Sequence, residues 1–164
     1  MPVEIRALTP ADVDPVVEFS LRAWAPVFQS FETVLGRRIY AHIYPDWLAS
    51  QARAVAGVCR DEAISVWVAV QDGRPVGFVA VVFHDEAHSE PDSGEIEMLA
   101  VDPEFQRRGI ADALISFAVD RMRAAGVRLA VIGTGGDPGH APARRAYERA
   151  GFTPLPLVRY YRAL

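Results

Sequence analysis

The amino-acid sequence predicts an α/β (α+β) fold, a mixed central sheet flanked by about four helices. Two β-rich segments, 63–70 and 76–83, are joined by an Asp-Gly turn and predict a hairpin. A third segment, 95–101, leads into an amphipathic helix over 110–125 and then a strand over 128–132. Strand, helix and strand in this order form a parallel crossover. The hairpin and the crossover together make the sheet mixed.

The rest of the chain supplies the outer elements. Residues 3–6 alternate apolar and polar side chains, as an edge strand does. Thr9 and Pro10 are typical of a helix start, which predicts a helix over 10–22. Tyr44-Pro45 breaks the next segment, because the residue before proline avoids helical geometry. The remaining elements are expected as helices over 46–60 and 142–150 and a last strand over 158–163.

Length and composition predict one globular domain over residues 1–164. Apolar residues make up 51% of the chain and charged residues 23%, which is ordinary for a folded domain. No apolar run approaches the roughly 18–20 residues of a membrane span, and the start lacks a signal peptide's apolar core. With Cys59 as the single cysteine, no internal disulfide is expected. We expect a cytoplasmic protein without a membrane partner, and the net charge of −4 argues against nucleic acid.

The most informative stretch is 100–112, where a strand runs through a short loop into a helix. The residues at the turn are Gln106, Arg107, Arg108, Gly109, Ile110 and Ala111. Free backbone N–H groups and the helix dipole make a helix N-terminus a binding site for anions. Gly109 lets a phosphate approach the backbone, and the two arginines add positive charge. The stretch therefore predicts a pyrophosphate cradle over 106–111.

Two blocks resemble landmarks of the GNAT superfamily of N-acetyltransferases. Gln106-Arg107-Arg108-Gly109-Ile110-Ala111 resembles the family's acetyl-CoA motif Gln/Arg-x-x-Gly-x-Gly/Ala, with alanine where many relatives have the last glycine. The block 140–152 resembles the second landmark, a helix that ends Tyr-Glu-x-x-Gly-Phe. The blocks follow the family's order and spacing, and the resemblance covers roughly residues 62–164. It implies a GNAT fold with six or seven strands and a parallel pair at the cofactor site.

The resemblance implies an enzyme that moves acetyl from acetyl-CoA to a primary amine by direct attack in a ternary complex, without a metal. Such a reaction needs a neutral amine, a stabilised oxyanion and a protonated leaving thiolate. Tyr147 is the candidate acid, because the family places this tyrosine at the thioester sulfur. A phenol with a pKa near ~10 is also protonated at neutral pH. A tyrosine that only packs between helix and sheet is the alternative.

Glu97 and Glu95 are the candidates for the base. They stand two residues apart on one expected strand and so share a face, while Ile96 and Met98 take the other face. Two carboxylates on one face raise one another's pKa toward the working range of a base. In the family a glutamate on this strand often deprotonates the amine, which favours Glu97, but some relatives place the base where Glu95 falls. A solvated strand face is the alternative.

The resemblance also implies contacts with the cofactor arm. Leu99, Ala100 and Val101 belong to a strand that splays from the 128–132 strand, so that the arm enters as a pseudo-strand beside the Leu99 N–H. His140 stands where many relatives have an asparagine that contacts the arm, and a helix N-cap is its alternative role. Arg144, in the first turn of that helix, is placed to reach a phosphate or to face solvent.

Three further patterns bear on the site. His84 and His88 suggest a metal site, but their four-residue spacing suits a helix and the sequence predicts a loop, so no metal is expected. The acidic loop 84–94 either steers a cationic amine by its field or is simply solvated. The glycine-rich loop 133–137 lacks the Gly-Lys-Ser/Thr of a P-loop. It follows a parallel strand, where ligands bind in open sheets, so Asp137 is a candidate acceptor contact.

The acceptor stays open at this stage. The aromatic segment 24–47, which in the family forms part of the acceptor site, favours a small, partly apolar amine, although such aromatics commonly pack in a core. A protein N-terminus or lysine is the alternative acceptor. A non-catalytic acyl-CoA-binding or sensing module is the alternative function. A homodimer is expected only because symmetric dimers are the commonest assembly.

Overall fold

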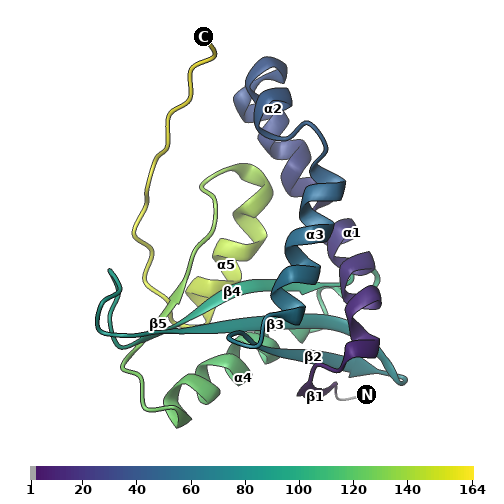
Figure 1. Cartoon of the computed structure of the whole chain (residues 1–164), viewed down its shortest axis with the longest axis vertical. Coiled ribbons are helices and arrows are strands. Elements are labelled where there is room, and N and C mark those ends of the chain that lie inside the picture. Colours follow the sequence, from purple (N-terminus) through teal and green to yellow (C-terminus); the bar gives the residue numbers. More distant parts are fainter. Residues whose placement is uncertain (1–2) are drawn as a thin grey trace.

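The computed structural model describes residues 3–164 as one mixed sheet with helices on both faces (Figure 1). The strands are β1 (Glu4–Ala7), β2 (Ser65–Gln71), β3 (Arg74–His84), β4 (Ser93–Val101) and β5 (Leu129–Ile132). They lie side by side in chain order. Neighbours from β1 to β4 run antiparallel, and β4 and β5 run parallel. The predicted hairpin, the parallel pair and the mixed sheet are confirmed.

Helices cover the sheet from above and below. They are α1 (Val13–Leu35), α2 (Arg37–Ile43), α3 (Trp47–Arg60), α4 (Ile110–Ala124) and α5 (Ala141–Arg149). Short 3-10 turns lie at Pro10–Asp12, Pro103–Phe105 and Pro138–His140. Figure 1 shows α1 and α3 over one face of the sheet and α4 under the other. This arrangement leaves the ends of β4 and β5 to the loops that lead into α4 and α5.

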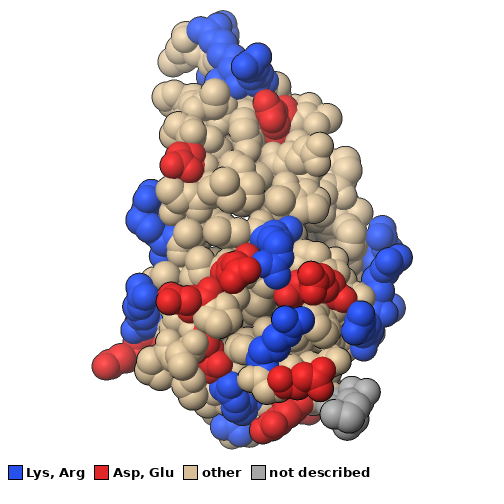
Figure 2. Space-filling view, turned by 90° about the vertical axis from the view of Figure 1, so that its right-hand side faces the viewer, with Lys and Arg blue, Asp and Glu red and all other residues tan. Residues whose placement is uncertain are grey.

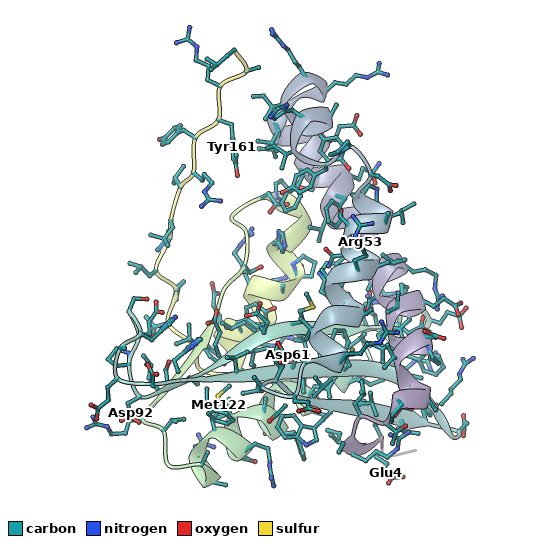
Figure 3. All side chains as sticks on the ribbon, viewed as in Figure 1. Glu4, Arg53, Asp61, Asp92, Met122 and Tyr161 are labelled. Atoms are coloured by element: carbon teal, nitrogen blue, oxygen red, sulfur yellow. The ribbon has the colours of Figure 1, made fainter. Side chains whose placement is uncertain are left out.

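Each face of the sheet has its own apolar cluster. Under the sheet, α4 presents one stripe of buried side chains four residues apart, Ile110, Leu114, Ala118 and Met122. Gly94 of β4 lies directly against this stripe, because a Cβ at that position would collide with the side chain of Met122 (Figure 3). The opposite cluster joins α1 and α3 to the sheet through Val16, Phe19, Val55, Val68 and Phe78.

Helix α1 is longer than the sequence prediction. The helix expected to end at Arg22 continues to Leu35, where Gly36 with a φ of 76° ends it. Pro26 lies inside the helix, although it lacks the N–H that an interior position donates. Trp24 meets Phe78 of β3 edge-on, with ring centroids 6.4 Å apart, so packing against the sheet continues past Arg22. Tertiary contacts therefore override the local helix-breaking signal.

The strand predicted over 158–163 is wrong. Within residues 3–164 the sheet has five strands, where six or seven were expected, and five α-helices stand where about four were expected. Two prolines, Pro154 and Pro156, open the last segment, and neither can donate a backbone hydrogen bond to the β5 edge. The chain leaves the sheet at this point and adds no strand to it.

Residues 153–164, the C-terminal tail, run from the sheet toward α2 as an extended segment (Figure 1). The Arg38 guanidinium donates to the carbonyl oxygen of Leu164 at 2.9 Å. In Figure 3 the side chain of Tyr161 lies on the side of the tail that faces the helices. The tail is apolar but exposed, since Leu155 and Leu157 are each 82% exposed.

The surface carries charges of both signs. On the face shown in Figure 2, basic and acidic side chains are interleaved over the lower half, with no continuous basic stripe on that face. Such a stripe is the usual footprint of a nucleic-acid-binding domain. Across residues 3–164, no helix combines the length and the hydropathy that crossing a bilayer requires.

Candidate active site

Strands β4 and β5 separate half-way along β4. Their pairing begins with Ser93 opposite Leu129 and ends with Ile96 opposite Ile132. Residues 97–101 continue beside β3 alone, so the backbone groups on their other side have no strand partner. A cleft of about 470 Å³ opens at this separation. An extended cofactor arm fits such a gap as an added strand, because unpaired backbone groups line it.

Glu97 is the extra residue of a β-bulge in β4. Met98 pairs with Ala80 and Ile96 with Val81, so no residue of β3 stands opposite Glu97. The expectation that Ile96 and Met98 share a face is therefore wrong. Ile96 packs into the cluster with α4 and Met98 into the cluster with α1 and α3. The bulge interrupts the alternation, and the exposed Glu97 lines the cleft.

Glu95 has different surroundings. It is not among the residues that line the cleft, and its Oε2 lies 2.7 Å from Nε2 of His84. The His84 ring stacks on His88, with centroids 3.7 Å apart. The two glutamates expected to act on one another are thus separated, one in the cleft and one in a histidine pair. Within residues 3–164, no group of three or more His, Cys, Asp or Glu side chains is arranged to hold a metal ion.

The loop before α4 has the geometry that an anion cradle needs. Gln106 Nε2 donates to the carbonyl of Val101 at 3.1 Å, which ties the loop to the end of β4. Arg107 and Gly109 both have positive φ, 60° and 78°. Left-handed residues in a turn direct successive backbone N–H groups to one side, a shape that binds anions. Helix α4 begins at Ile110 without a side-chain cap, so its first N–H groups stay free for a ligand.

The two arginines of the cradle are exposed. The Arg108 guanidinium lies over the ring of buried Phe105, with Cζ 5.0 Å from the centroid, which fixes its direction. The predicted cradle residues that line the cleft are Gln106, Arg107, Gly109, Ile110 and Ala111. Arg108 lines a second hollow on the same loop, together with Pro103, Glu104, Gln106 and Arg107. The residues and the free N–H groups fit a pyrophosphate at this end of the cleft.

Tyr147 of α5 is half-buried and lines the cleft. Burial raises the pKa of its phenol to about 12. Its ring meets Phe152 edge-on at 6.4 Å, and its carbonyl accepts the Phe152 N–H at 3.0 Å. The second landmark block thus positions its own tyrosine through the turn that follows it. Tyr147 packs against the core cluster and also lines the cleft.

A polar cluster, Ser30, Asp137 and His140, ties the loop after β5 to α1. The Asp137 carboxylate accepts from Ser30 Oγ at 2.6 Å and lies 2.5 Å from His140 Nδ1. Burial by itself raises the pKa of Asp137, but the hydrogen bonds from Ser30 and His140 outweigh burial, and the pKa is lowered. Sequence reasoning did not find Ser30, because a serine within a helix 107 residues away carries no pattern that marks it.

Arg144 neither faces solvent freely nor points at a phosphate site, and the His140 side chain does not cap its helix. The Arg144 Nη1 donates to the carbonyls of Gly135 and Asp137 at 2.6 and 2.8 Å. The guanidinium therefore holds the shape of the glycine-rich loop. His140 stands at the N-cap position of α5, but its side chain makes no capping hydrogen bond, because it pairs with Asp137. It also lines the cleft.

Helix α1 forms the wall opposite β4. Its residues in the cleft are Ala23, Trp24, Pro26 and Val27. Further along, Phe31 stacks on Tyr44 at 5.5 Å and lies 5.5 Å from the His140 ring. Phe28 stacks on Trp47 at 4.4 Å. The sequence allowed either core packing or a place beside the ligand site for the aromatic segment. In the structure most of its rings pack on one another, and one side of the segment lines the cleft.

Cys59 lies outside the cleft lining. Burial raises the pKa of its thiol to about 11, so the thiol keeps its proton at neutral pH. A protonated thiol is a poor nucleophile. This side chain therefore offers no covalent route for a transferred group.

A family model described as the acetyltransferase (GNAT) family matches residues 26–152. The chain belongs to the GNAT family of acetyltransferases. The expected fold and enzyme class are confirmed: GNAT proteins are acetyl-CoA-dependent N-acetyltransferases, and acetyl-CoA is the co-substrate of the class. The splayed strands and the 106–111 cradle are the parts of this GNAT chain that fit the CoA moiety.

Among curated proteins, the mycothiol acetyltransferase of Beutenbergia cavernae is 33% identical over 129 residues, which covers 70% of this chain and 43% of that protein. The mycothiol acetyltransferase of Sanguibacter keddieii is 39% identical over 93 residues, which covers 56% of this chain and 29% of that protein. The chain therefore spans less than half the length of these two GNAT relatives.

Solved structures share the whole fold at lower identity. AAC(6')-Iy in complex with the bisubstrate analog CoA-S-monomethyl-acetylneamine has a TM-score of 0.67 and 20% identity, and covers 100% of this chain and 99% of that one. A ribosomal-protein-alanine N-acetyltransferase from Brucella melitensis biovar Abortus 2308 has a TM-score of 0.59 and 20% identity, with 99% of both chains covered. At these identities the likeness establishes the GNAT fold.

Proposed function

We propose that this GNAT protein transfers the acetyl group of acetyl-CoA to a primary amine on a small molecule, by direct attack in a ternary complex. One observation carries the proposal: a single cleft joins elements that the two substrates need. The cradle 106–111 lies at one end, the unpaired part of β4 runs along it, and α1 forms the opposite wall. Tyr147, Glu97 and His140 all open into it.

The cofactor contacts follow from this cleft. The 106–111 loop binds the pyrophosphate through its N–H groups and arginines. Leu99, Ala100 and Val101 line the cleft and offer their backbone to the pantetheine arm, with the Leu99 N–H assigned to the thioester carbonyl. Bound acetyl-CoA supplies an acetyl carbon activated as a thioester. Arg144 does not contact the pantetheine arm in this proposal. It fixes the conformation of the loop 133–137 beside the arm.

Tyr147 is proposed as the proton donor to the leaving sulfur. Its pKa of about 12 keeps the phenol protonated at the pH of the cell. A positioned general acid of this kind typically contributes 10²–10⁴-fold. The phenol is half-buried, so it delivers its proton where little water competes.

Glu97 is proposed as the base that receives a proton from the arriving ammonium ion. It is exposed at the bulge and lines the cleft, so it can pass the proton on to solvent. Glu95 is the second candidate, but His84 already holds its carboxylate outside the cleft lining. The acidic loop next to β4 adds a negative field that favours a cationic acceptor.

A small-molecule amine is the acceptor that fits best. Support comes from the names of a sequence relative, a mycothiol acetyltransferase, and of a structural neighbour, an aminoglycoside N-acetyltransferase. The apolar wall of Trp24, Pro26 and Val27 suits a partly apolar molecule. A protein acceptor is the alternative, since a ribosomal-protein-alanine N-acetyltransferase shares the fold. A cytoplasmic location is part of the proposal, because acetyl-CoA is abundant there.

The test is a calorimetric titration with acetyl-CoA, followed by a free-thiol release assay over a panel of amines. Micromolar binding with thiol release that depends on one class of small amine supports the proposal. Binding with release only on peptides replaces the small amine with a protein acceptor. Binding without any release favours a sensing module, and an absence of binding overturns the cofactor assignment.

A homodimer is also proposed, on the strength of the C-terminal tail. Its leucines are exposed, and β5 beside it ends the sheet with Leu129 48% exposed. An apolar extended segment and an open strand edge are complementary surfaces, and two copies can exchange them symmetrically. Light scattering on the full chain and on a form ending at Phe152 decides this: the full chain should be dimeric and the shortened form monomeric.

A further inference from the structure

Asp137 holds the His140 ring in one orientation. Nδ1 of the ring lies 2.5 Å from Oδ1 of the carboxylate, while Oδ2 accepts from Ser30 Oγ at 2.6 Å and from the Gly139 N–H at 3.0 Å. The side chains of His140 and Asp137 are only 17% and 8% exposed. The carboxylate is therefore fixed from α1 and from its own loop, and it fixes the imidazole in turn.

The charge state of Asp137 determines which ring nitrogen carries the proton. Burial opposes ionisation, but the bonds from Ser30 and His140 lower the pKa of Asp137, so the group is a carboxylate at neutral pH. A carboxylate only accepts hydrogen bonds, so Nδ1 of His140 is the donor. In the neutral imidazole the other nitrogen, Nε2, is then a free base. This is how a carboxylate selects the tautomer of a catalytic histidine.

Nε2 is available to a substrate. Within residues 3–164 it makes no hydrogen bond, it is not among the buried polar atoms left without a partner, and His140 is one of the residues that line the cleft. The ring lies 5.5 Å from Phe31 of α1 and stands at the start of α5, the helix that carries Tyr147. His140 thus lies between the acceptor wall and the cofactor side.

The chain makes room for this pair with two glycines. A Cβ on Gly135 would collide with Asp137 Oδ1 and His140 Nδ1, and a Cβ on Gly139 would collide with the Ser30 side chain. Arg144 clamps the carbonyls on either side of the turn, at Gly135 and Asp137. A residue that merely caps a helix needs none of these arrangements. The two glycines and the Arg144 hydrogen bonds therefore indicate that the loop holds the imidazole in one fixed orientation.

We propose that His140 is a second proton acceptor in the acetyl transfer, with Asp137 as its positioning residue. The inference rests on the proposed function and adds a proton acceptor to it. A primary amine reaches the cleft mainly as an ammonium ion and loses two protons before it becomes an amide nitrogen. Glu97 is assigned the first, before attack. His140 takes the second, which the nitrogen sheds inside the cleft.

The step balances. As the N–C bond forms and the C–S bond breaks, the nitrogen gives its second proton to His140 Nε2, and Tyr147 gives a proton to the sulfur. The imidazolium then loses its proton, and the Tyr147 phenolate regains one. Of the two protons that leave the nitrogen, one ends on the CoA thiol and one in solvent. No oxidant, reductant or metal enters the step.

The decisive variant is His140→Asn. Asparagine keeps a donor toward Asp137 but has no basic nitrogen. We expect kcat to fall about 100-fold or more, as for loss of a general base, while the Kd for acetyl-CoA in calorimetry stays within about threefold, because the phosphate cradle is untouched. In His140→Ala, added imidazole should restore part of kcat. His88→Asn, a histidine outside the cleft, is the matched control and should keep the wild-type rate.

A pH profile separates a proton acceptor from a structural clamp. Asp137 contacts the ring, and Arg144 and Tyr44 lie close to Asp137. The other charged and titratable groups of the cleft are Glu97, Arg107, Asp112, Tyr147 and Arg149. The wild-type kcat should fall along an acid limb, because a ring that already carries two protons cannot accept the proton of the amine. That limb should disappear in His140→Asn and shift in Asp137→Asn, where the carboxylate is lost.

Three results overturn the inference. The first is a His140→Asn enzyme that keeps its kcat and its acid limb. The second is a variant that loses acetyl-CoA affinity at unchanged kcat, which makes position 140 a contact of the cofactor arm. The third is His140→Ala that folds by circular dichroism but gains no rate from imidazole. Each differs from failure of the proposed function, in which the wild-type protein itself binds no acetyl-CoA or releases no thiol.

Discussion

Ile96 and Ile132 stand opposite each other as the last paired residues of β4 and β5, and the bulge residue Glu97 follows at once. The end of pairing with β5 and the break in register with β3 therefore fall on neighbouring residues. At this point β4 stops pairing with β5, and its pairing with β3 shifts by one residue before it continues to Val101. The position of the candidate base and the gap proposed for the cofactor arm thus both result from the break in strand pairing at residues 96–97.

Tyr147→Phe should lower kcat about 10²–10³-fold, because it removes only the hydroxyl that protonates the sulfur. The ring still packs on Phe152, so the Kd for acetyl-CoA should stay within about twofold. Tyr40→Phe, outside the cleft lining, is the control. The measurements are steady-state kinetics and calorimetry, and an unchanged kcat would remove Tyr147 from the role of acid.

Glu97→Gln should lower kcat/KM for the amine about 10–100-fold at neutral pH, because an arriving ammonium ion loses its base. The defect should shrink as the pH rises toward the amine's own pKa, where the substrate arrives neutral. Glu95→Gln, which only disturbs the pair with His84, should change kcat/KM much less. If Glu95→Gln proves the more damaging of the two across the pH range, the base is Glu95.

Gly109→Ala should raise the Kd for acetyl-CoA about fivefold or more, since alanine resists a φ of 78° by roughly 1–2 kcal/mol and moves the cradle N–H groups. Gly126→Ala is a matched control, because Gly126 has a φ of 82° just after α4 and outside the cleft lining. Both variants should lose similar stability in urea. Equal acetyl-CoA affinity in the two would contradict the cradle.

Asp12→Asn should destabilise the fold by about 1–3 kcal/mol at neutral pH, the range for a charge-assisted hydrogen bond. The bond from Arg6 at 2.7 Å, helped by Thr9 against the opposing effect of burial, lowers the pKa of Asp12 to about 2. A depressed pKa stabilises the folded state above the unfolded value, near ~4. Urea unfolding should therefore show the wild-type advantage shrinking as the pH falls from ~4 toward 2.

The sequence predicted the elements around Gly109 and Tyr147 well because the signals for them are local. The strand, loop and helix around Gly109 depend on neighbours in the chain, and each took the expected form. Tyr147 lies in the cleft for the same reason, since the Gly151-Phe152 turn that positions it follows directly. These elements need no information from distant residues.

The acceptor side could not be predicted in the same way. The bulge at Glu97 arises from the register with β3, and a single strand's alternation does not record it. Helix α1 runs past Pro26 because Trp24 packs on Phe78 of a strand far along the chain. The role of Ser30 depends on its hydrogen bond to Asp137, in the loop that follows β5. All three depend on contacts distant in sequence.

One hydrogen bond, from Ser30 to Asp137, links the wall that would select the acceptor to the ring proposed to receive its proton. A protein engineer who reshapes α1 to admit a bulkier amine would therefore also disturb the orientation of His140. The proposed role of His140 therefore predicts that changes in acceptor specificity also change turnover. Libraries that seek new acceptors should keep Ser30, Gly135 and Gly139 constant and vary the face of α1 that carries Trp24 and Val27.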